Sequence, residues 1–440
     1  MKKEIYDTYK VFTPTQPAIN TFIERDIKVN NHLVDSLRTP GKQVVIYGHS
    51  GCGKSTLIIN KLNQVYENTI ITRCMKGMTF ESLILDAFDQ LGRFYSVETK
   101  TNGFKIAPEI NLSYNDIKAS LKLVELNKSK TITQKEFVPP QLTPQRLARF
   151  FGESKSCWVL EDFHKIKGEE KTRASQIMKV FMDMSLEYSD LKLIAIGAVG
   201  TARQVVEYDN EMNNRVSEVF VPYMSDDEIE SIIISGEKLL DLRFPEKISE
   251  KIVTYSCGLP SICHQLCLNM CTNRNIYQTQ KETTYLKMGD FEKAIEKFAD
   301  EKSDSFKADF DKAIKVPNKS LRNVPKAIIK AALKVNKDEF SFDDIKYHIE
   351  FKDIPSKEIE SKLTQLCRTD RGELLIHDDN SNLYRFNNLF LKNWALMQFR
   401  KEKEDVLNIR NRTDQKVIDR LLEIIEKDIT DEYDVYIEEL

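Results

Sequence analysis

Short apolar runs alternate with longer segments of helical spacing through the first half of the chain. Each run is bounded by glycine or polar residues, and apolar residues recur at helical intervals between the runs. Apolar runs this short are typical of strands that are buried on both faces of a parallel sheet. We therefore expect an α/β fold with a parallel five-stranded sheet that helices cover on both faces. The expected strands lie at 44–47, 69–74, 157–160, 191–197 and 219–222, and the expected helices at 56–62, 79–91, 143–151 and 174–185.

After Pro222 the strand-like runs stop and helical spacing continues alone. Ser225 and Glu228 are spaced as a capping box, in which each side chain accepts a hydrogen bond from the backbone N–H of the other residue. They predict a helix that runs to about Leu242, and three more helices are expected at 246–255, 260–272 and 290–301. This region is predicted to form a helical lid.

Residues 321–401 show three helical segments followed by two strand-like segments around a polar turn, which predicts a winged-helix domain. The last residues become acidic, which favours a solvated tail, with a helix that docks on a partner as the alternative. The predicted organisation is an N-terminal helical segment at 1–36, an α/β core at 37–222 with a β-rich insertion at about 95–140, a lid at 223–301, a linker at 302–320, the winged helix at 321–401 and an acidic helical tail at 402–440.

Composition limits the kinds of partner. The chain has 440 residues, 41% of them hydrophobic, and a formal net charge of −3. That charge gives no overall basic field for nucleic acid, so a DNA contact would need a local patch. We find no apolar stretch near the roughly 20 residues that span a bilayer, and the N-terminus is polar. The sequence predicts a soluble cytoplasmic protein of several domains without a membrane partner.

Four of the eight cysteines lie close together, at 257, 263, 267 and 271, with His264 among them. A zinc site is one interpretation of such a cluster. On a helix, however, each four-residue step moves the next thiol about 6 Å along the axis, which spreads the thiols instead of directing them at one ion. The spacing therefore favours cysteines that are buried as small apolar side chains.

One segment carries a complete phosphate-binding sequence, Gly48-His49-Ser50-Gly51-Cys52-Gly53-Lys54-Ser55, followed by Thr56. It lies between an expected strand and an expected helix, where backbone N–H groups and the helix dipole attract phosphate. Lys54 would supply a positive charge at the β and γ phosphates, and Ser55 a hydroxyl for Mg²⁺. ATP is expected in preference to GTP, because Asn336-Lys337-Asp338-Glu339 fails the guanine-recognition pattern at its fourth position.

Glu161 and Asp162 directly follow the apolar run 157–160. Two carboxylates at the end of such a strand would stand near the phosphate loop. There, one would hold the metal and its waters while the other polarises the attacking water. By register, Glu161 is the expected metal residue and Asp162 the expected base. The more usual order places Asp first, so exchanged roles are the alternative.

Together with four other segments, the phosphate loop resembles the branch of the AAA+ superfamily that STAND signalling ATPases share with origin-recognition-type ATPases, which often carry a winged helix as well. The resemblance implies that Arg25 approaches the nucleotide and that Pro260 faces adenine. It also implies that Thr201 or Arg203 senses the γ-phosphate. The other segments that carry it are Phe22-Ile23-Glu24-Arg25-Asp26, Glu161-Asp162, Thr201-Ala202-Arg203 and Gly258-Leu259-Pro260, and it spans about residues 22–299.

Two positions depart from the pattern of that branch. Glu24 stands where glycine is usual, and His264 stands where the lid helix would carry a sensor arginine. How the lid senses phosphate is therefore left open by the sequence.

Arg215 lies just before the last expected strand. In ATPases of this resemblance, that position often holds an arginine finger that reaches the γ-phosphate of a neighbouring subunit. Such a role would require self-association. A salt bridge to Glu211 or Glu218 is the alternative.

DNA binding has weaker support. In the expected reading helix, 356–363, acidic side chains nearly cancel the basic ones. A better basic stripe precedes and follows the start of the winged helix, although a solvated helix face explains it equally. The stripe comprises Lys312, Lys315, Lys319, Arg322, Lys326, Lys330 and Lys334.

The leading functional hypothesis is a molecular switch that binds and hydrolyses ATP and assembles with, or controls, a separate effector protein. Bacterial antiviral defence is a setting suggested by analogy alone. The alternatives are a DNA-binding AAA+ ATPase of origin or transposition type and a nucleotide-bound scaffold that does not hydrolyse.

Overall fold

We describe the chain from a computed structural model. The expected β-rich insertion, the acidic tail, Thr201 and Arg203 lie outside the described residues. The structure describes residues 4–92, 143–198, 212, 214–301, 303–316, 322–335, 339–378 and 381–399. By its internal contacts the chain divides into two compact units, Met1–Leu268 with Ile276–Tyr285, and Asn269–Asn275 with Leu286–Leu440.

The first unit is built on a five-stranded, all-parallel sheet, which confirms the predicted α/β fold class. Its strand order is β2-β3-β4-β1-β5. In the central pairs, Val45 lies opposite Ala195 and Val159 lies opposite Ile194. The strands are β1 (Gln43–Tyr47), β2 (Asn68–Arg73), β3 (Ser156–Glu161), β4 (Lys192–Gly197) and β5 (Val216–Phe220).

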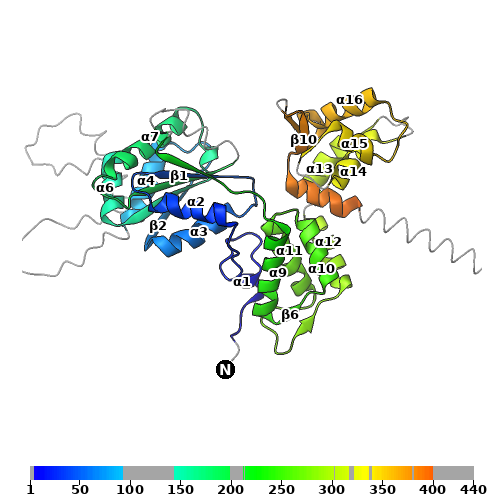
Figure 1. The fold of residues 1–440 in the computed structure, drawn as a ribbon, viewed down its shortest axis with the longest axis horizontal. Helices are drawn as coiled ribbons and strands as arrows, with labels where there is room; N and C mark the ends of the chain where they lie inside the picture. Colours follow the sequence, from blue (N-terminus) through cyan, green and yellow to red (C-terminus); the bar gives the residue numbers. More distant parts are fainter. Residues whose placement is uncertain are drawn as a thin grey trace, which may run out of the picture. The chain divides into compact units, whose positions relative to one another are not determined.

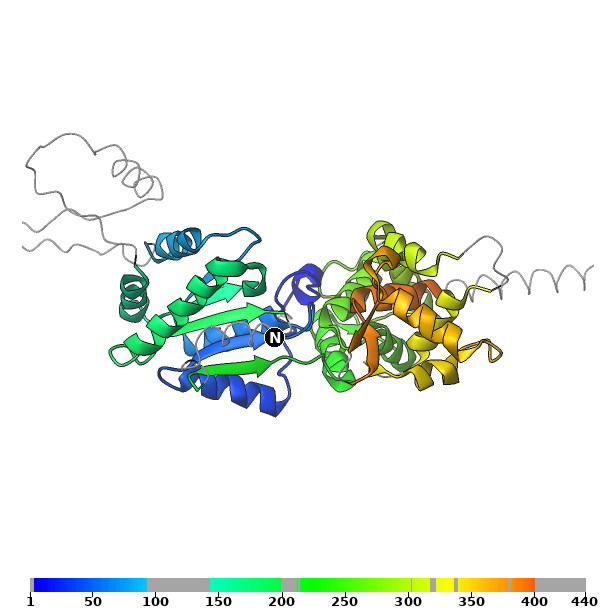
Figure 2. The ribbon, with the colours of Figure 1, turned by 90° about the horizontal axis from the view of Figure 1, so that it is seen from above.

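Helices cover both faces of this sheet, as Figures 1 and 2 show. Alternate residues of each strand belong to different cores: Val45 packs in one, while Val44 and Ile46 pack in the other. This alternation explains why the strands read as continuous apolar runs. On one face lie α2 (Ile27–Arg38) and α3 (Lys54–Val65), and on the other lie α4 (Phe80–Gly92), α6 (Pro144–Glu153) and α7 (Gly168–Met184).

The strand order places the candidate chemistry at one edge of the sheet. β4 lies between β1 and β3, and the chain reverses its direction across the sheet at β2. Since all five strands are parallel, the segments after Tyr47 and after Glu161 leave from the same edge. Crevices at the carboxyl ends of such strands are where α/β sheets bind ligands.

The first unit continues into helices that follow the sheet. The capping box at the start of α9 is present: Glu228 N donates to Ser225 Oγ at 3.2 Å, and Ser225 N donates to Glu228 Oε2 at 2.9 Å. A pair of two-residue parallel strands in this region was not predicted. The elements are α9 (Asp226–Leu240), β6 (Leu242–Arg243), α10 (Glu246–Ser256), α11 (Pro260–Asn273) and β7 (Thr284–Tyr285).

An N-terminal strap, residues 6–25, joins these helices to the sheet domain and contains α1 (Thr8–Val11). Phe12 is fully buried, with its ring 6.4 Å from that of Phe244. Gly236 of α9 must be glycine there, because a Cβ atom would lie 2.3 Å from the Phe12 ring. At the other end of the strap, Asn60 of α3 donates to the Ala18 carbonyl at 3.0 Å.

The second unit has a core of its own, and one prediction in it was wrong. Residues 302–320 were expected to be a linker, yet α13 covers most of them. Phe310 and Ala313 anchor that helix, because both are buried and the Phe310 ring lies 5.4 Å from the ring of Trp394. The helices are α12 (Met288–Glu301), α13 (Ser303–Ile314), α14 (Val324–Lys334), α15 (Phe342–His348) and α16 (Ser356–Leu366), and residues 389–399 are also helical.

A small antiparallel sheet accompanies these helices, in the order β8-β10-β9. The hairpin was expected from the sequence, whereas β8 was not, because two residues give no periodicity to detect. Its strands are β8 (Glu339–Phe340), β9 (Leu375–Asp378) and β10 (Leu383–Phe386). The winged-helix assignment remains a prediction. In the described parts of the chain, no helix combines the length and apolar composition that crossing a membrane requires.

Candidate functional site

The phosphate-loop sequence forms the turn between β1 and α3. Gly51 and Gly53 have φ of 79° and 90°, values that side chains other than glycine rarely adopt. At Gly48 the reason is close approach, because a Cβ atom would lie 2.4 Å from the Val221 carbonyl oxygen. Helix α3 begins at Lys54, so its first backbone N–H groups point toward the loop. The loop therefore has the backbone form of an anion site.

Lys54 lies over this loop. Its Nζ donates to the Gly48 carbonyl at 3.0 Å and to the His49 carbonyl at 2.6 Å. Cys52, also part of the motif, is fully buried, and burial raises the pKa of its thiol. Cys52 therefore packs behind the loop, while Lys54 presents the charge.

The two carboxylates that follow β3 differ in their surroundings. Glu161 accepts a 2.7 Å hydrogen bond from Ser55 Oγ and forms a 3.5 Å ion pair with Arg73. Asp162 has φ of 59° and forms a 2.6 Å ion pair with Lys165, in the short 3-10 helix Phe163–Lys165. Arg73 was missed by sequence reasoning, although its place at the end of β2 was a usable signal.

A cavity of about 750 Å³ opens beside the loop, within the first unit. It is lined by ten of the predicted site residues and also by residues 13–19 of the strap, which the sequence did not mark. Gly48, His49 and Cys52 support the loop without lining the cavity. The predicted residues that line it are Arg25, Ser50, Gly51, Gly53, Lys54, Ser55, Thr56, Glu161, Asp162 and Pro260.

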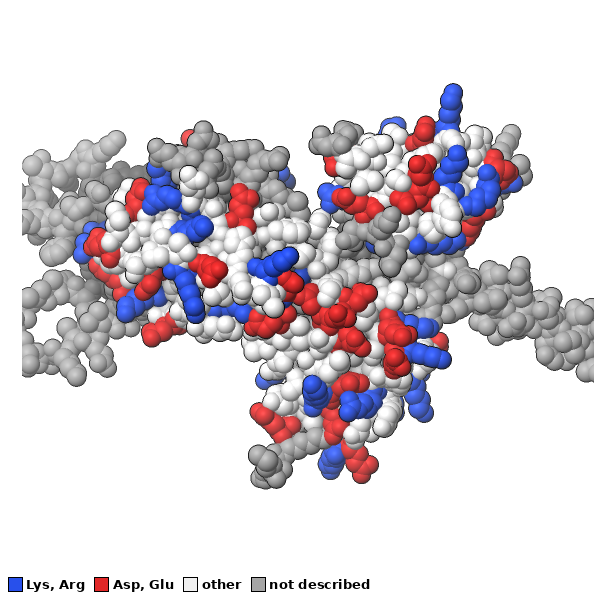
Figure 3. Space-filling model, in the orientation of Figure 1, with Lys and Arg blue, Asp and Glu red and all other residues white. Residues whose placement is uncertain are grey.

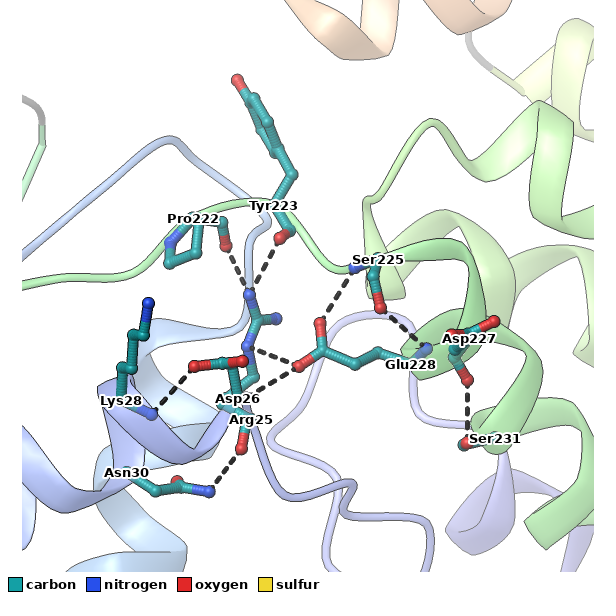
Figure 4. Close-up of polar contacts among 10 residues, drawn as sticks. All are labelled: Arg25, Asp26, Lys28, Asn30, Pro222, Tyr223, Ser225, Asp227, Glu228 and Ser231. Atoms are coloured by element: carbon teal, nitrogen blue, oxygen red, sulfur yellow. Dashed lines mark hydrogen bonds and ion pairs between the residues drawn. The ribbon is translucent and has the colours of Figure 1, made fainter.

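Arg25 lines the cavity, but its guanidinium mainly contacts other groups of the protein (Figure 4). Nη2 donates to the carbonyls of Pro222 and Tyr223 at 2.6 and 3.0 Å, and Nε lies 3.6 Å from Glu228 Oε1. Arg25 is 5% exposed, and burial lowers its pKa while Glu228 opposes that shift. Its Nη1 is buried without a hydrogen-bond partner. Arg25 thus holds residues 222–224, which we call the hinge.

Glu24, which stands where the resemblance would place a glycine, has a specific partner. Its two carboxylate oxygens lie 2.8 and 2.6 Å from Nζ of Lys61, on α3. Lys61 is 6% exposed, so its ammonium needs a counter-ion. Glu24 therefore ties the strap to the helix that begins at the phosphate loop.

His264, the second departure, is neutral. It is 3% exposed, and burial lowers its pKa to about 4. Its Nδ1 accepts a 3.3 Å hydrogen bond from the Thr13 N–H, which assigns the ring proton to Nε2. The cavity-lining residues from the hinge onward are Met224, Ile232, Pro260, Ser261 and His264, and none of these carries a charge. The charged side chains that line the cavity therefore belong to the strap and the sheet domain.

Arg215 lies away from the phosphate loop of its own chain. It precedes β5, at the edge of the sheet opposite to the loop, and pairs with Asp183 at 2.8 Å. The alternative expectation was a salt bridge to Glu211 or Glu218. The ion pair in the structure is with Asp183, and Glu211 lies outside the described residues.

The cysteines that suggested a metal are buried. Cys263, Cys267 and Cys271 are each 0% exposed in α11. Within the described ranges, no group of three or more His, Cys, Asp and Glu side chains is placed to hold a metal ion. These thiols fill space in the protein interior.

Part of the basic stripe is paired in the second unit, where Lys312 forms an ion pair with Asp309 at 3.0 Å. Arg322 forms an ion pair with Asp353 at 2.5 Å, and Lys330 lies 4.0 Å from Glu350. Lys326 and Lys330 also stand over the ring of Phe399, at 5.6 and 5.2 Å. Figure 3 shows acidic side chains beside basic ones on the visible face of this unit. Lys319 lies outside the described residues.

Comparison with known proteins gives likenesses of structure alone. No protein-family model matches the chain. No curated protein matches it either. The Walker-type ATPase PABY2304 of Pyrococcus abyssi is 14% identical with a TM-score of 0.47, covering 86% of this chain and 99% of that one. The ORC2 protein of Aeropyrum pernix, in ADPNP-ADP complexes, is 11% identical with a TM-score of 0.46, covering 91% and 99%. The ORC1 protein of the same organism, in complex with DNA, is 11% identical with a TM-score of 0.43, covering 89% and 96%.

Proposed function

We propose that the cavity binds ATP with Mg²⁺ and that the chain hydrolyses this ATP. The observation that carries the proposal is the meeting of the Ser55 hydroxyl and the Glu161 carboxylate, 2.7 Å apart, beside a loop over which Lys54 lies. A loop with a purely structural role would not require a lysine, a hydroxyl and a carboxylate from another strand to lie close together. Together they match what a nucleoside triphosphate requires.

The donor set fits Mg²⁺. Hydroxyl and carboxylate oxygens are the hard ligands that Mg²⁺ prefers, and Mg²⁺ usually takes few protein ligands beside phosphate and water. Ser55 and Glu161 would hold it. When bound, the ion would neutralise charge on the phosphates. Lys54 would turn from the loop carbonyls to the phosphate oxygens and supply a second positive charge.

Asp162 is the proposed base. It lines the cavity beside Glu161, and its carboxylate is half-exposed, so a water molecule has access to it. The 2.6 Å ion pair with Lys165 would orient the carboxylate. At the uncharged end of the cavity, Pro260 would pack against adenine.

We extend this proposal to a conformational change that ATP would cause and to the protein that would respond to it. ATP binding would change how the helices after the hinge meet the sheet domain, and hydrolysis would reset them. We propose a separate effector protein as the recipient, with self-association through Arg215. The setting in bacterial antiviral defence rests on analogy alone. DNA is a weaker candidate partner, because three residues of the basic stripe, Lys312, Arg322 and Lys330, already pair with acidic side chains.

Binding and turnover of ATP test the proposal. We expect the wild-type chain to bind ATP, to release phosphate in a Mg²⁺-dependent reaction, and to lose tight binding in Lys54→Ala. Lys247→Ala, which removes an exposed lysine of α10, is the matched control and should bind normally. Melting temperatures of both variants would show that the fold is retained. Equal ATP affinity in Lys54→Ala and in the wild type would overturn the assignment of the loop.

A further inference from the structure

Tyr223, in the hinge, contacts the protein through its backbone and its ring in opposite directions. Its carbonyl accepts from Arg25 Nη2 at 3.0 Å, whereas its side chain points away from that guanidinium, as Figure 4 shows. The ring stacks on the imidazole of His49, with centroids 4.9 Å apart and an interplanar angle of 18°. His49 belongs to the phosphate loop. The hinge and the loop are thus joined side chain to side chain.

The loop and the hinge also touch through the backbone. Val221 N donates to the Tyr47 carbonyl at 2.9 Å, and the Val221 carbonyl approaches Gly48 too closely to allow a Cβ atom there. A change in the loop backbone would therefore be felt directly at the hinge. Lys54 provides the reason for such a change, because its bond to the His49 carbonyl competes with any bond to phosphate.

On its other side the hinge contacts the starts of two helices, α9 and α11. Arg25 pairs with Glu228, which belongs to the capping box of α9. Met224 N donates to the Gly258 carbonyl at 2.9 Å, just before α11 begins at Pro260. A Cβ atom on Gly258 would lie 2.8 Å from Tyr223 Cβ, so the contact is tight. A shift of Tyr223 would therefore move the starts of α9 and α11 together.

We propose that Tyr223 is a positioning residue that transmits the state of the phosphate loop to α9 and α11 through its stack on His49. When phosphate draws Lys54 away from the His49 carbonyl, the imidazole moves, and the stacked ring carries that movement to the hinge. Arg25, at the Tyr223 carbonyl, passes it to Glu228. This inference rests on the proposed function and adds the route by which ATP would act on the helices after the hinge.

Substitutions at both rings separate this role from a structural one. Tyr223 and His49 are both half-buried, so shortening either leaves no large cavity in a core. Tyr223→Leu and His49→Ala remove the stack, whereas Tyr223→Phe and His49→Phe keep two stacked rings and serve as matched controls. The stack is worth roughly a two- to tenfold change in an equilibrium constant, so ATP affinity should change within that range.

The decisive readout is hydrogen exchange at the backbone amides of residues 222–229, measured without nucleotide and with ATP and Mg²⁺. We expect ATP to change exchange there in the wild type and in both phenylalanine variants, and to change it far less in Tyr223→Leu and His49→Ala. The double variant, Tyr223→Leu with His49→Ala, should be no worse than either single one, because both remove the same contact.

The results distinguish a failure of the Tyr223 route from a failure of the proposed ATP binding. If Tyr223→Leu shows the full ATP-dependent change at the hinge, or if the wild type binds ATP without any change there, the transmission through Tyr223 is wrong while ATP binding stands. If the wild type does not bind ATP, the proposed function itself is wrong.

Discussion

Ser55 and Glu161 lie 106 positions apart in the chain, yet the hydroxyl of one donates a 2.7 Å hydrogen bond to the carboxylate of the other. The sheet order explains their meeting, since β1 and β3 flank β4 and end at the same edge. Arg73, from the end of β2, reaches the same carboxylate at 3.5 Å. Two strands and one helix thus supply the polar groups around a single point.

Replacing the Asp162 carboxylate with its amide should have a different effect from replacing that of Glu161. Asp162→Asn should still bind ATP but hydrolyse it at least about 10²-fold more slowly, because it loses the base that assists the attacking water. Glu161→Gln should instead weaken the dependence on Mg²⁺, since it removes a charged metal ligand. Phosphate release measured over a Mg²⁺ titration distinguishes the two variants. The reverse pattern would exchange the two roles.

Glu24 should stabilise the fold only when the Lys61 ammonium is present. Glu24→Gln leaves a buried ammonium without its counter-ion, and we expect a loss of about 1–2 kcal/mol, reduced from the value for a fully buried pair because Glu24 is itself half-exposed. In a Lys61→Met background the same change should cost little. Urea unfolding of the four proteins in this cycle measures the coupling. Equal losses in both backgrounds would mean that the ion pair contributes nothing.

His264 should make the first unit sensitive to acid. The pKa of its imidazole is about 4 in the fold, against 6.5 for an unperturbed histidine. The neutral ring therefore contributes fully above about pH 6.5, and this contribution is lost as the pH falls toward 4. At pH 5 the loss should reach roughly 2 kcal/mol.

A His264→Asn variant isolates that effect, because its amide oxygen can accept from the Thr13 N–H but does not titrate. Comparing urea unfolding of this variant and of the wild type from pH 8 to pH 4.5 should show a steeper decline in the wild type. Parallel declines would place the acid sensitivity elsewhere.

Arg215 should act on a neighbouring chain if it acts on ATP at all, because it lies at the far edge of the sheet from its own loop. Arg215→Ala should bind ATP normally and lose turnover. Mixing it with Lys54→Ala, which keeps Arg215 but lacks a loaded site, should recover part of the activity. Asp183→Asn is the control, since it breaks the ion pair and keeps the arginine.

Turnover per chain should also rise with protein concentration. A rate that stays flat over concentration, with no recovery in the mixture and an equal loss in Asp183→Asn, would assign Arg215 to its ion pair with Asp183.

Sequence patterns predicted the elements whose signal is local and strong. The sheet strands are continuous apolar runs, and the start of α9 was marked by Ser225 and Glu228. Helix α13 was missed because its anchors, Phe310 and Ala313, are few and its surface is highly charged. The partnerships of Glu24 with Lys61 and of His49 with Tyr223 were beyond prediction, since each depends on how distant segments pack. Chemistry carried by adjacent residues is readable from one sequence, whereas chemistry shared across the fold is not.

The strap also sets the order in which the protein can be completed on the ribosome. Tyr6 N donates to Thr279 Oγ1, a partner 273 positions later in the chain. At a synthesis rate of about 5–20 residues per second, roughly ten seconds to one minute pass between the synthesis of the strap and that of this partner. For most of this interval the Phe12 ring lacks Gly236 and Phe244, against which it packs in the finished protein. The nascent chain therefore carries an exposed apolar anchor until α9 and Phe244 have emerged.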